Sequence, residues 1–309
     1  MGKIAFVFAG QCAQKPGMGW DVSENSTAAA GVFFMADNVR KGTSAQCFEA
    51  GQEELSETKN TQPCIYTVDL AIAEALRERG VEADMVAGYS LGEFAALAYA
   101  GVFSYDRGLN IVQQRGGHMQ EASEKCDTGM AAVLKLPDEQ VEELCSKYEN
   151  VFPVNFNCKG QVTVAGDKKE LAAFAPEAKE AGGLVRILEV SGGFHSPFMK
   201  EAADRFEGVV AEEKFSAPKI PVFSNRTSEE YGQDAEEIRR LLVEQISNPI
   251  RWKTLIENMI RQGVDTFVEV GPGTALTKMI TRISKDVTML NVCDMDTLEA
   301  VVERIGKNG

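Results

Sequence analysis

Short apolar runs alternate with amphipathic segments along most of the chain. Runs of strand length lie at 3–9, 85–87, 220–224, 266–270 and 288–292. Between them, apolar residues recur every three to four positions, which predicts helices at 60–79, 93–100, 104–122, 198–213, 235–246, 252–262, 274–284 and 296–305, with shorter helices between 26 and 55. Strands that alternate with helices favour a mostly parallel sheet covered on both faces. We therefore expect an α/β fold.

The pattern changes between residues 127 and 192. Strands are predicted at 130–136, 152–157, 161–165 and 185–190, and helices at 138–147 and 168–181. This βαββαβ order is that of a ferredoxin-like α+β unit. We predict a large catalytic domain made of 1–126 and 193–309, with a small inserted domain at 127–192.

Length and composition place the chain among globular proteins. Its 309 residues are 44% hydrophobic and 25% charged, enough for one large domain or two. The apolar run at 3–9 leads into polar residues without a cleavage pattern, so we interpret it as a buried strand and not a signal peptide. Since no apolar run is long enough to cross a bilayer, we expect a cytoplasmic protein that does not contact membranes.

Cysteine, histidine and charge narrow the possible functions. Seven scattered cysteines without a C-x-x-C pair indicate neither a disulfide framework nor a zinc site. Two histidines, His118 and His195, make a metal site improbable, and we expect none. A net charge of −14 argues against nucleic-acid binding.

The strongest candidate for chemistry is Gly88-Tyr89-Ser90-Leu91-Gly92, between a predicted strand and a predicted helix. In the G-x-S-x-G pattern the serine occupies a strained turn, and the glycines avoid clashes that a Cβ would cause. At a helix N-terminus, free N–H groups would stabilise an oxyanion. Ser90 is therefore a candidate nucleophile, although a turn that only joins strand to helix would look the same.

A serine nucleophile needs a base, and only two histidines are available. His195 lies in a glycine-rich loop where the two predicted domains meet, a favourable place for a cleft. His118 lies in the middle of a predicted helix, where a solvent-exposed or packing side chain is a simpler explanation than a catalytic base. We favour His195 as the base; its alternative is a hydrogen-bonded interface histidine.

Several motifs together resemble the malonyl-CoA:acyl carrier protein transacylases, acyltransferases of fatty acid and polyketide synthesis. The family's GQGxQ loop, GHSLGE elbow, QxRGxxM helix and A-F-H-S-P loop are matched in order by 10–14, 88–93, 113–119 and 193–197. Two further matches are 248–252 and 269–273, so the similarity runs from residue 4 to about 285. Together these motifs are far more specific than any one of them.

The resemblance implies a role for each matching residue. Ser90 would be the acylated nucleophile and His195 its base, oriented by the backbone carbonyl of Gln245. The backbone N–H groups of Gln11 and Leu91 would form the oxyanion hole.

Substrate choice would rest on two further residues. Arg115 would bind the carboxylate of malonate, and the bulk of Phe194 would exclude a methyl branch. Alternatively, Arg115 forms an ion pair with a nearby carboxylate, and Phe194 is simply a core residue.

Two positions depart from the family pattern. Tyr89 replaces the usual histidine, keeps a hydroxyl donor and could still orient substrate near the acyl pocket. Cys12 replaces a glycine beside the oxyanion loop, and it would be strained by about 1–3 kcal/mol if that loop needs positive φ.

The implied reaction is a ping-pong transfer. Malonyl would pass from malonyl-CoA to Ser90 and then to the phosphopantetheine thiol of acyl carrier protein, without a metal or other cofactor. A fatty acid role is expected for a monomeric, free-standing chain. The alternatives are a trans-acting polyketide synthase acyltransferase, a serine hydrolase of acyl thioesters and a catalytically idle subunit that binds carrier protein.

Docking of the carrier protein is a separate expectation. Lys278, Arg282 and Lys285 are spaced to share one face of a predicted helix. Because the family's carrier protein is acidic and this chain is too, a local basic patch would be needed for docking. The alternative is a solvated helix face.

Overall fold

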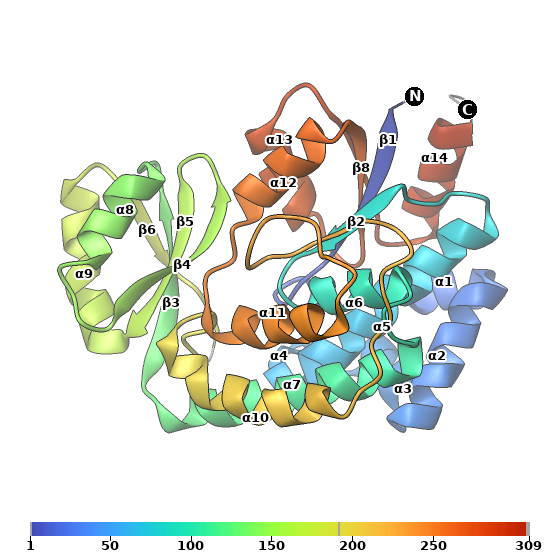
Figure 1. Ribbon diagram of the computed structural model, residues 1–309, viewed down its shortest axis with the longest axis horizontal. Helices are drawn as coiled ribbons and strands as arrows, with labels where there is room; N and C mark the ends of the chain where they lie inside the picture. Colours follow the sequence, from blue (N-terminus) through green and yellow to red (C-terminus); the bar gives the residue numbers. More distant parts are fainter. Residues whose placement is uncertain (1, 191, 307–309) are drawn as a thin grey trace.

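A five-stranded parallel sheet lies at the centre of the larger part of the molecule (Figure 1). The computed structural model describes residues 2–190 and 192–306. The strand order is β7-β2-β1-β8-β9, and every pair in it is parallel. The strands are β1 (Lys3–Phe8), β2 (Met85–Gly88), β7 (Val222–Phe223), β8 (Val264–Val270) and β9 (Thr288–Val292). The prediction of a mostly parallel sheet is confirmed.

Both faces of this sheet are buried, as the continuous apolar runs require. On β1, Phe6 and Phe8 pack against Tyr99 of α6 (Gly92–Tyr99), with ring centroids 5.7 and 5.8 Å apart. Ala5 and Val7 point to the other face, because successive side chains of a strand alternate. They share a core with α12 (Trp252–Arg261) and α13 (Ala275–Ile283).

Further helices surround this layer, and the short helices expected between 26 and 55 are present. They are α1 (Trp20–Asn25), α2 (Thr27–Val39), α3 (Thr43–Glu49), α4 (Gln52–Ser56), α5 (Thr58–Glu78), α7 (Tyr105–Lys125), α10 (Lys200–Ala211), α11 (Ala235–Ser247) and α14 (Met295–Gly306), with a 3₁₀ turn η1 (Pro197–Met199). The predicted start of α5 was too late. Gln120 accepts a hydrogen bond from the Thr58 N–H (2.9 Å), so the helix begins there and Pro63 lies inside it.

A four-stranded antiparallel sheet lies to one side of the large sheet (Figure 1). Its order is β4-β5-β3-β6, and the chain order is βαββαβ as predicted. The elements are β3 (Thr128–Leu134), α8 (Asp138–Cys145), β4 (Val151–Cys158), β5 (Gln161–Asp167), α9 (Lys168–Glu180) and β6 (Leu184–Ile187). The two helices pack on one another and on the sheet, which gives this part its own apolar core.

Two predicted strands are shorter than expected. β6 ends at Ile187 instead of 190; the Leu188 N–H still donates to the Met130 carbonyl of β3 (2.9 Å), and Leu188 and Val190 line a pocket. β7 has only two residues, because the chain turns directly after it and the Ser228 N–H donates to the Ser224 carbonyl (2.8 Å). Both deviations occur where strands give way to loops.

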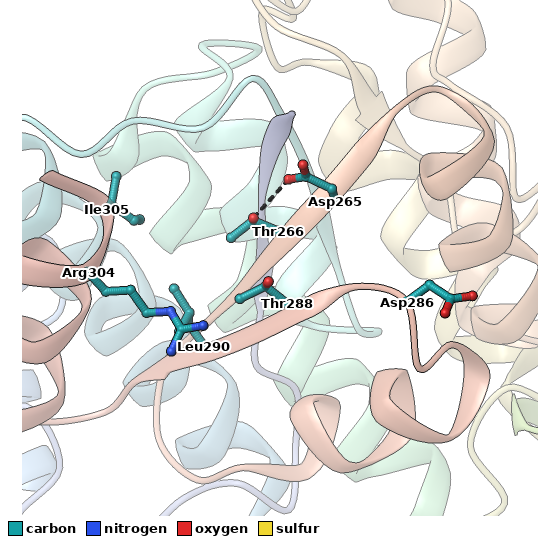
Figure 2. A pocket seen from close by; sticks show the side chains of 7 residues that line it. All are labelled: Asp265, Thr266, Asp286, Thr288, Leu290, Arg304 and Ile305. Atoms are coloured by element: carbon teal, nitrogen blue, oxygen red, sulfur yellow. Dashed lines mark hydrogen bonds between the residues drawn. The ribbon is translucent and has the colours of Figure 1, made fainter. Parts of the chain in front are cut away.

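A cavity of about 390 Å³ lies at the amino-terminal ends of β8 and β9 (Figure 2). Thr266 donates a hydrogen bond to Asp265 there (2.9 Å), while the side chain of Asp286 points away from that of Arg304. None of the residues predicted to act in catalysis lines it. In parallel sheets, ligands bind at the carboxyl ends of the strands, which is the opposite edge.

Among the described residues there is neither a membrane-spanning helix nor a cluster of metal-binding side chains. Within 2–190 and 192–306, no helix has the length and apolar character needed to span a membrane. Over the same residues, no cluster of three or more histidine, cysteine or acidic side chains is placed to hold a metal ion.

Candidate active site

Ser90 lies in the sharp turn that joins β2 to α6. Its φ is 54°, a left-handed conformation that is strained for a side chain with a Cβ. A Cβ on Gly88 would come within 1.9 Å of the Gly92 carbonyl carbon, and a Cβ on Gly92 within 2.2 Å of the Phe8 oxygen. Both glycines are therefore required by close backbone packing, and the turn holds Ser90 at the carboxyl edge of the sheet.

Asn225 clamps this turn from the neighbouring strand. Its Oδ1 accepts from the Ser90 N–H (2.7 Å), and its Nδ2 donates to the Gly88 carbonyl (2.7 Å). Asn225 follows β7, next to β2 in the sheet. The sequence analysis missed it, although a polar residue just after a predicted parallel strand was a usable signal.

His195 is the histidine placed against Ser90. Its Nε2 is 2.8 Å from Ser90 Oγ, and its Nδ1 is 2.8 Å from the Gln245 carbonyl oxygen. A carbonyl can only accept, so Nδ1 carries the proton and Nε2 accepts from the serine hydroxyl. His118 lies on α7, beside Arg205 and Glu121.

The environment of His195 favours the neutral imidazole. Burial lowers its pKa to about 3, the positive charge of Arg115 adds to this shift, and the hydrogen bond to the Gln245 carbonyl opposes it. His195 can therefore accept a proton at neutral pH, and the imidazolium that forms is a strong acid.

The Arg115 guanidinium is buried beside the nucleophile. Its Nη1 donates to Gln62 (2.8 Å), its Nη2 donates to Gln245 Oε1 (2.7 Å), and Nη2 is 3.4 Å from Ser90 Oγ. Among the ion pairs of the described residues, none involves Arg115. Burial lowers its pKa, and the Glu93 carboxylate opposes this effect. Because its contacts are neutral oxygens, a substrate carboxylate would be its first direct ionic partner.

Glu93 is a second residue that the sequence analysis missed. Its carboxylate accepts from Tyr231 Oη (2.6 Å), from the Asn225 N–H (3.0 Å) and from Gln245 Nε2. Burial raises its pKa to about 7, although these hydrogen bonds and Arg115 oppose the shift. A charged residue at the start of an otherwise apolar helix was the available signal.

A pocket of about 260 Å³ opens above Ser90 and His195, between the two sheets. Gln11, Tyr89 and Phe194 line it from the large-sheet side. In the described part of the chain, the backbone N–H groups of Gln11 and Leu91 donate no hydrogen bond, which leaves them available to an oxyanion. Cys12 also lines the pocket with φ 80°, so its loop does adopt the positive φ that strains a cysteine.

The three basic residues predicted for docking do not share one helix face. Lys278 and Arg282 are exposed on α13, but this helix ends at Ile283 and Ser284 is extended. Lys285 therefore lies beyond the helix, which corrects the predicted spacing. Arg282 donates to Gln161 (2.8 Å), a residue that lines the pocket, so this basic pair lies near the pocket opening.

The chain is similar over nearly its whole length to curated proteins. The chain is 35% identical over 311 positions to the malonyl CoA-acyl carrier protein transacylase of Bacillus subtilis (strain 168), covering 99% of this chain and 98% of that protein. The enzyme of the same name from Staphylococcus aureus (strain MRSA252) is 34% identical over 308 positions, with 97% and 98% covered.

Solved structures are similar over their full length. A malonyl CoA-acyl carrier protein transacylase from Clostridium perfringens matches with a TM-score of 0.95 and 36% identity, covering 99% of this chain and 98% of that one. A malonyl-transacylase in complex with a type II PKS acyl-carrier protein matches with a TM-score of 0.94 and 34% identity, covering 98% and 99%. The family described as acyl transferase domain matches residues 5–302. The chain therefore belongs to the acyl transferase domain family.

Proposed function

We propose that this protein transfers malonyl from malonyl-CoA to the phosphopantetheine thiol of an acyl carrier protein. One observation carries the proposal: a hydrogen-bonded Ser90–His195 pair lies within 3.4 Å of a buried guanidinium that has no direct ionic partner. The relatives named above, at 34–36% identity over nearly the whole chain, support the same reaction.

Acylation begins when Ser90 Oγ attacks the thioester carbonyl and its proton passes to His195 Nε2. The N–H groups of Gln11 and Leu91 stabilise the oxyanion. As the intermediate collapses, the carbon–sulfur bond breaks and His195 returns the proton to the coenzyme A sulfur. The carrier thiol then loses its proton to His195, and its sulfur attacks the carbonyl carbon of the Ser90 ester. The bond between that carbon and Ser90 Oγ breaks, and His195 returns the proton to Ser90 Oγ.

Arg115 sets the substrate class. Its planar guanidinium would bind the free carboxylate of malonyl, an interaction that an acetyl group cannot make. Gln62 and Gln245 hold the guanidinium in place without neutralising it. Phe194 narrows the same pocket against a methyl branch.

The carrier protein would dock beside α13, where Lys278 and Arg282 are exposed near the pocket, with Lys285 just beyond. We assign the chain to fatty acid biosynthesis. The second candidate is a trans-acting polyketide synthase acyltransferase, because one similar structure is a malonyl-transacylase in complex with a type II PKS acyl-carrier protein. Cytoplasmic location, a monomeric state and the absence of a cofactor stay predictions.

The architecture fits the same proposal. We assign the parallel-sheet part, 1–126 and 193–309, to an α/β-hydrolase-like catalytic domain. The antiparallel part, 127–192, is assigned to a ferredoxin-like insertion, since the strand order β4-β5-β3-β6 is the one that a split βαβ pair produces.

The proposal is tested by intact mass spectrometry after mixing with malonyl-CoA, with and without holo carrier protein. We expect a malonyl adduct that persists until the carrier protein is added. Loss of the adduct to water would indicate a hydrolase, and no adduct would indicate a binding subunit. Ser90→Ala should abolish the adduct, whereas Ser146→Ala, at an exposed serine on the small domain, should leave it unchanged.

A further inference from the structure

Tyr89 begins a chain of hydrogen bonds that crosses from the nucleophile turn to the small sheet. Its hydroxyl donates to Asn157 Oδ1 (2.6 Å), and Asn157 Nδ2 donates to Thr163 Oγ1 (3.2 Å). Asn157 belongs to β4 and Thr163 to β5, while Tyr89 directly precedes Ser90. Both ends of the Asn157 amide are therefore occupied inside the protein.

The position of the Tyr89 hydroxyl is well defined because its ring packs against two neighbours. Trp252 is in edge-to-face contact with the ring, with centroids 5.4 Å apart and planes at 75°. A Cβ added to Gly10 would be 3.1 Å from Tyr89 Cδ1, so the oxyanion loop also lies against the ring. The phenol cannot swing without displacing one of these neighbours.

All three residues of this hydrogen-bond series, Tyr89, Asn157 and Thr163, line the acyl pocket. Tyr89 contributes from the wall that carries Ser90, and Asn157 and Thr163 contribute from the opposite wall. The backbones of the two walls are joined separately, since Phe156 N–H donates to the Ile250 carbonyl and Ile250 N–H to Val154, both at 2.9 Å. The Tyr89 hydroxyl therefore governs the side-chain surface of the pocket and not the docking of the sheets.

We propose that Tyr89 is a positioning residue that holds the Asn157 amide against β5 and thereby sets the width of the acyl pocket. Without the hydroxyl, Asn157 Oδ1 loses its partner and the amide can turn, which loosens the wall facing Ser90. The consequence is weaker exclusion of acyl groups wider than malonyl. This inference rests on the proposed acyl transfer.

The test compares kcat/KM for malonyl-CoA and methylmalonyl-CoA in Tyr89→Phe. We expect the methylmalonyl-to-malonyl ratio to rise about 10-fold, as loss of one pocket hydrogen bond predicts. Tyr66→Phe is the matched control, because it deletes a buried hydroxyl that donates to the Tyr105 carbonyl (3.0 Å) away from the pocket. Its ratio should equal that of the wild type.

Thr163→Val provides a second variant. It removes the hydroxyl that accepts the hydrogen bond from Asn157 Nδ2 while keeping a β-branched side chain in β5. We expect a smaller rise of the same ratio. An unchanged ratio in folded Tyr89→Phe, or in Thr163→Val should Tyr89→Phe fail to fold, overturns the inference. Failure of the proposed function would be seen separately, as a wild-type protein that forms no malonyl adduct.

Discussion

The two walls of the acyl pocket differ in chemistry. The large-sheet wall and the residues behind it hold the charged groups Arg115 and Glu93, and it contains Ser90 and His195, both with positive φ. The small-sheet wall consists of uncharged residues: Met130, Ala132, Asn155, Asn157, Gln161, Thr163, Leu188 and Val190. The difference indicates that the large-sheet wall performs the chemistry, whereas residues of both walls set the size and shape of the pocket.

The charged wall is stable because its charges are linked through neutral groups. The Gln245 amide accepts from Arg115 and donates to Glu93, while its backbone carbonyl accepts from His195. An unpaired buried charge would cost several kcal/mol, so removal of any one member should affect the others. The following predictions test this division between the walls, from the largest effect to the smallest.

Arg115→Ala should have the largest effect among them. It removes the partner of the malonyl carboxylate, so kcat/KM for malonyl-CoA should fall about 100- to 1,000-fold. Arg115→Lys should recover only part of this loss, because an ammonium cannot make the two-pronged contact. Acylation rates from rapid quench measure both variants. Equal activity of the lysine variant and the wild type would contradict the proposed fork geometry.

The pH dependence of acylation tests the environment of His195. Because burial and Arg115 lower its pKa to about 3, the imidazole should stay neutral at pH 5. An ordinary histidine, with a pKa of about 6.5, would lose about 30-fold in kcat/KM between pH 7.5 and 5, whereas we expect little change from His195 itself. Glu93, with a pKa of about 7, titrates in the same range, so the profile is also measured in Glu93→Gln. A fall with an apparent pKa near 6.5 that persists in this variant would contradict the buried, neutral base.

The same shift affects stability with a definite sign. The unfolded chain binds the His195 proton with a pKa of about 6.5, and the folded protein binds it only near 3. The unfolded state therefore gains protons first, and the contribution of His195 to stability declines as pH falls from about 6.5 toward 3.

Phe194→Ala tests steric selection by the large-sheet wall. Removing the ring should raise the methylmalonyl-to-malonyl ratio of kcat/KM by about 10-fold, since a methyl group in a pocket is worth about 1–3 kcal/mol. Phe194 and Tyr89 are both in the pocket, so their effects on this ratio can be compared directly. If this ratio is unchanged in Phe194→Ala, Phe194 does not select acyl groups by size, and the selection lies with the small-sheet wall.

The smallest effect is expected for charge reversal near the pocket opening. Arg282→Glu with Lys285→Glu should raise KM for the carrier protein about fivefold and leave acylation by malonyl-CoA unchanged, because exposed charges act mainly on encounter. Lys179→Glu, on an exposed position of α9, is the control. Unchanged transfer kinetics would show that these residues form an ordinary solvated surface.

The order of the elements could be predicted because it depends on local periodicity. The continuous apolar run of β1 and the three-to-four-residue spacing on α7 are visible in the sequence without knowledge of any partner. The predictions were wrong mainly at the ends of elements. Helix α5 begins at Thr58, earlier than predicted, where the N–H donates to Gln120, 62 residues away. Lys285 likewise seemed to extend a helix that ends two residues earlier.

The sequence by itself determined the nucleophile turn, since Gly88, Ser90 and Gly92 are neighbours whose conformations constrain one another. Through family motifs it also indicated His195 and Arg115. Only the tertiary structure decided the distances between Ser90, His195 and Arg115. It alone also decided the hydrogen bonds of Asn225 to the nucleophile turn and the partners of Tyr89 and Glu93. Those hydrogen bonds join residues 68 to 152 positions apart, and no local pattern predicts which distant side chains will meet. They exist because the parallel sheet brings the carboxyl ends of its strands to one edge, opposite the small sheet.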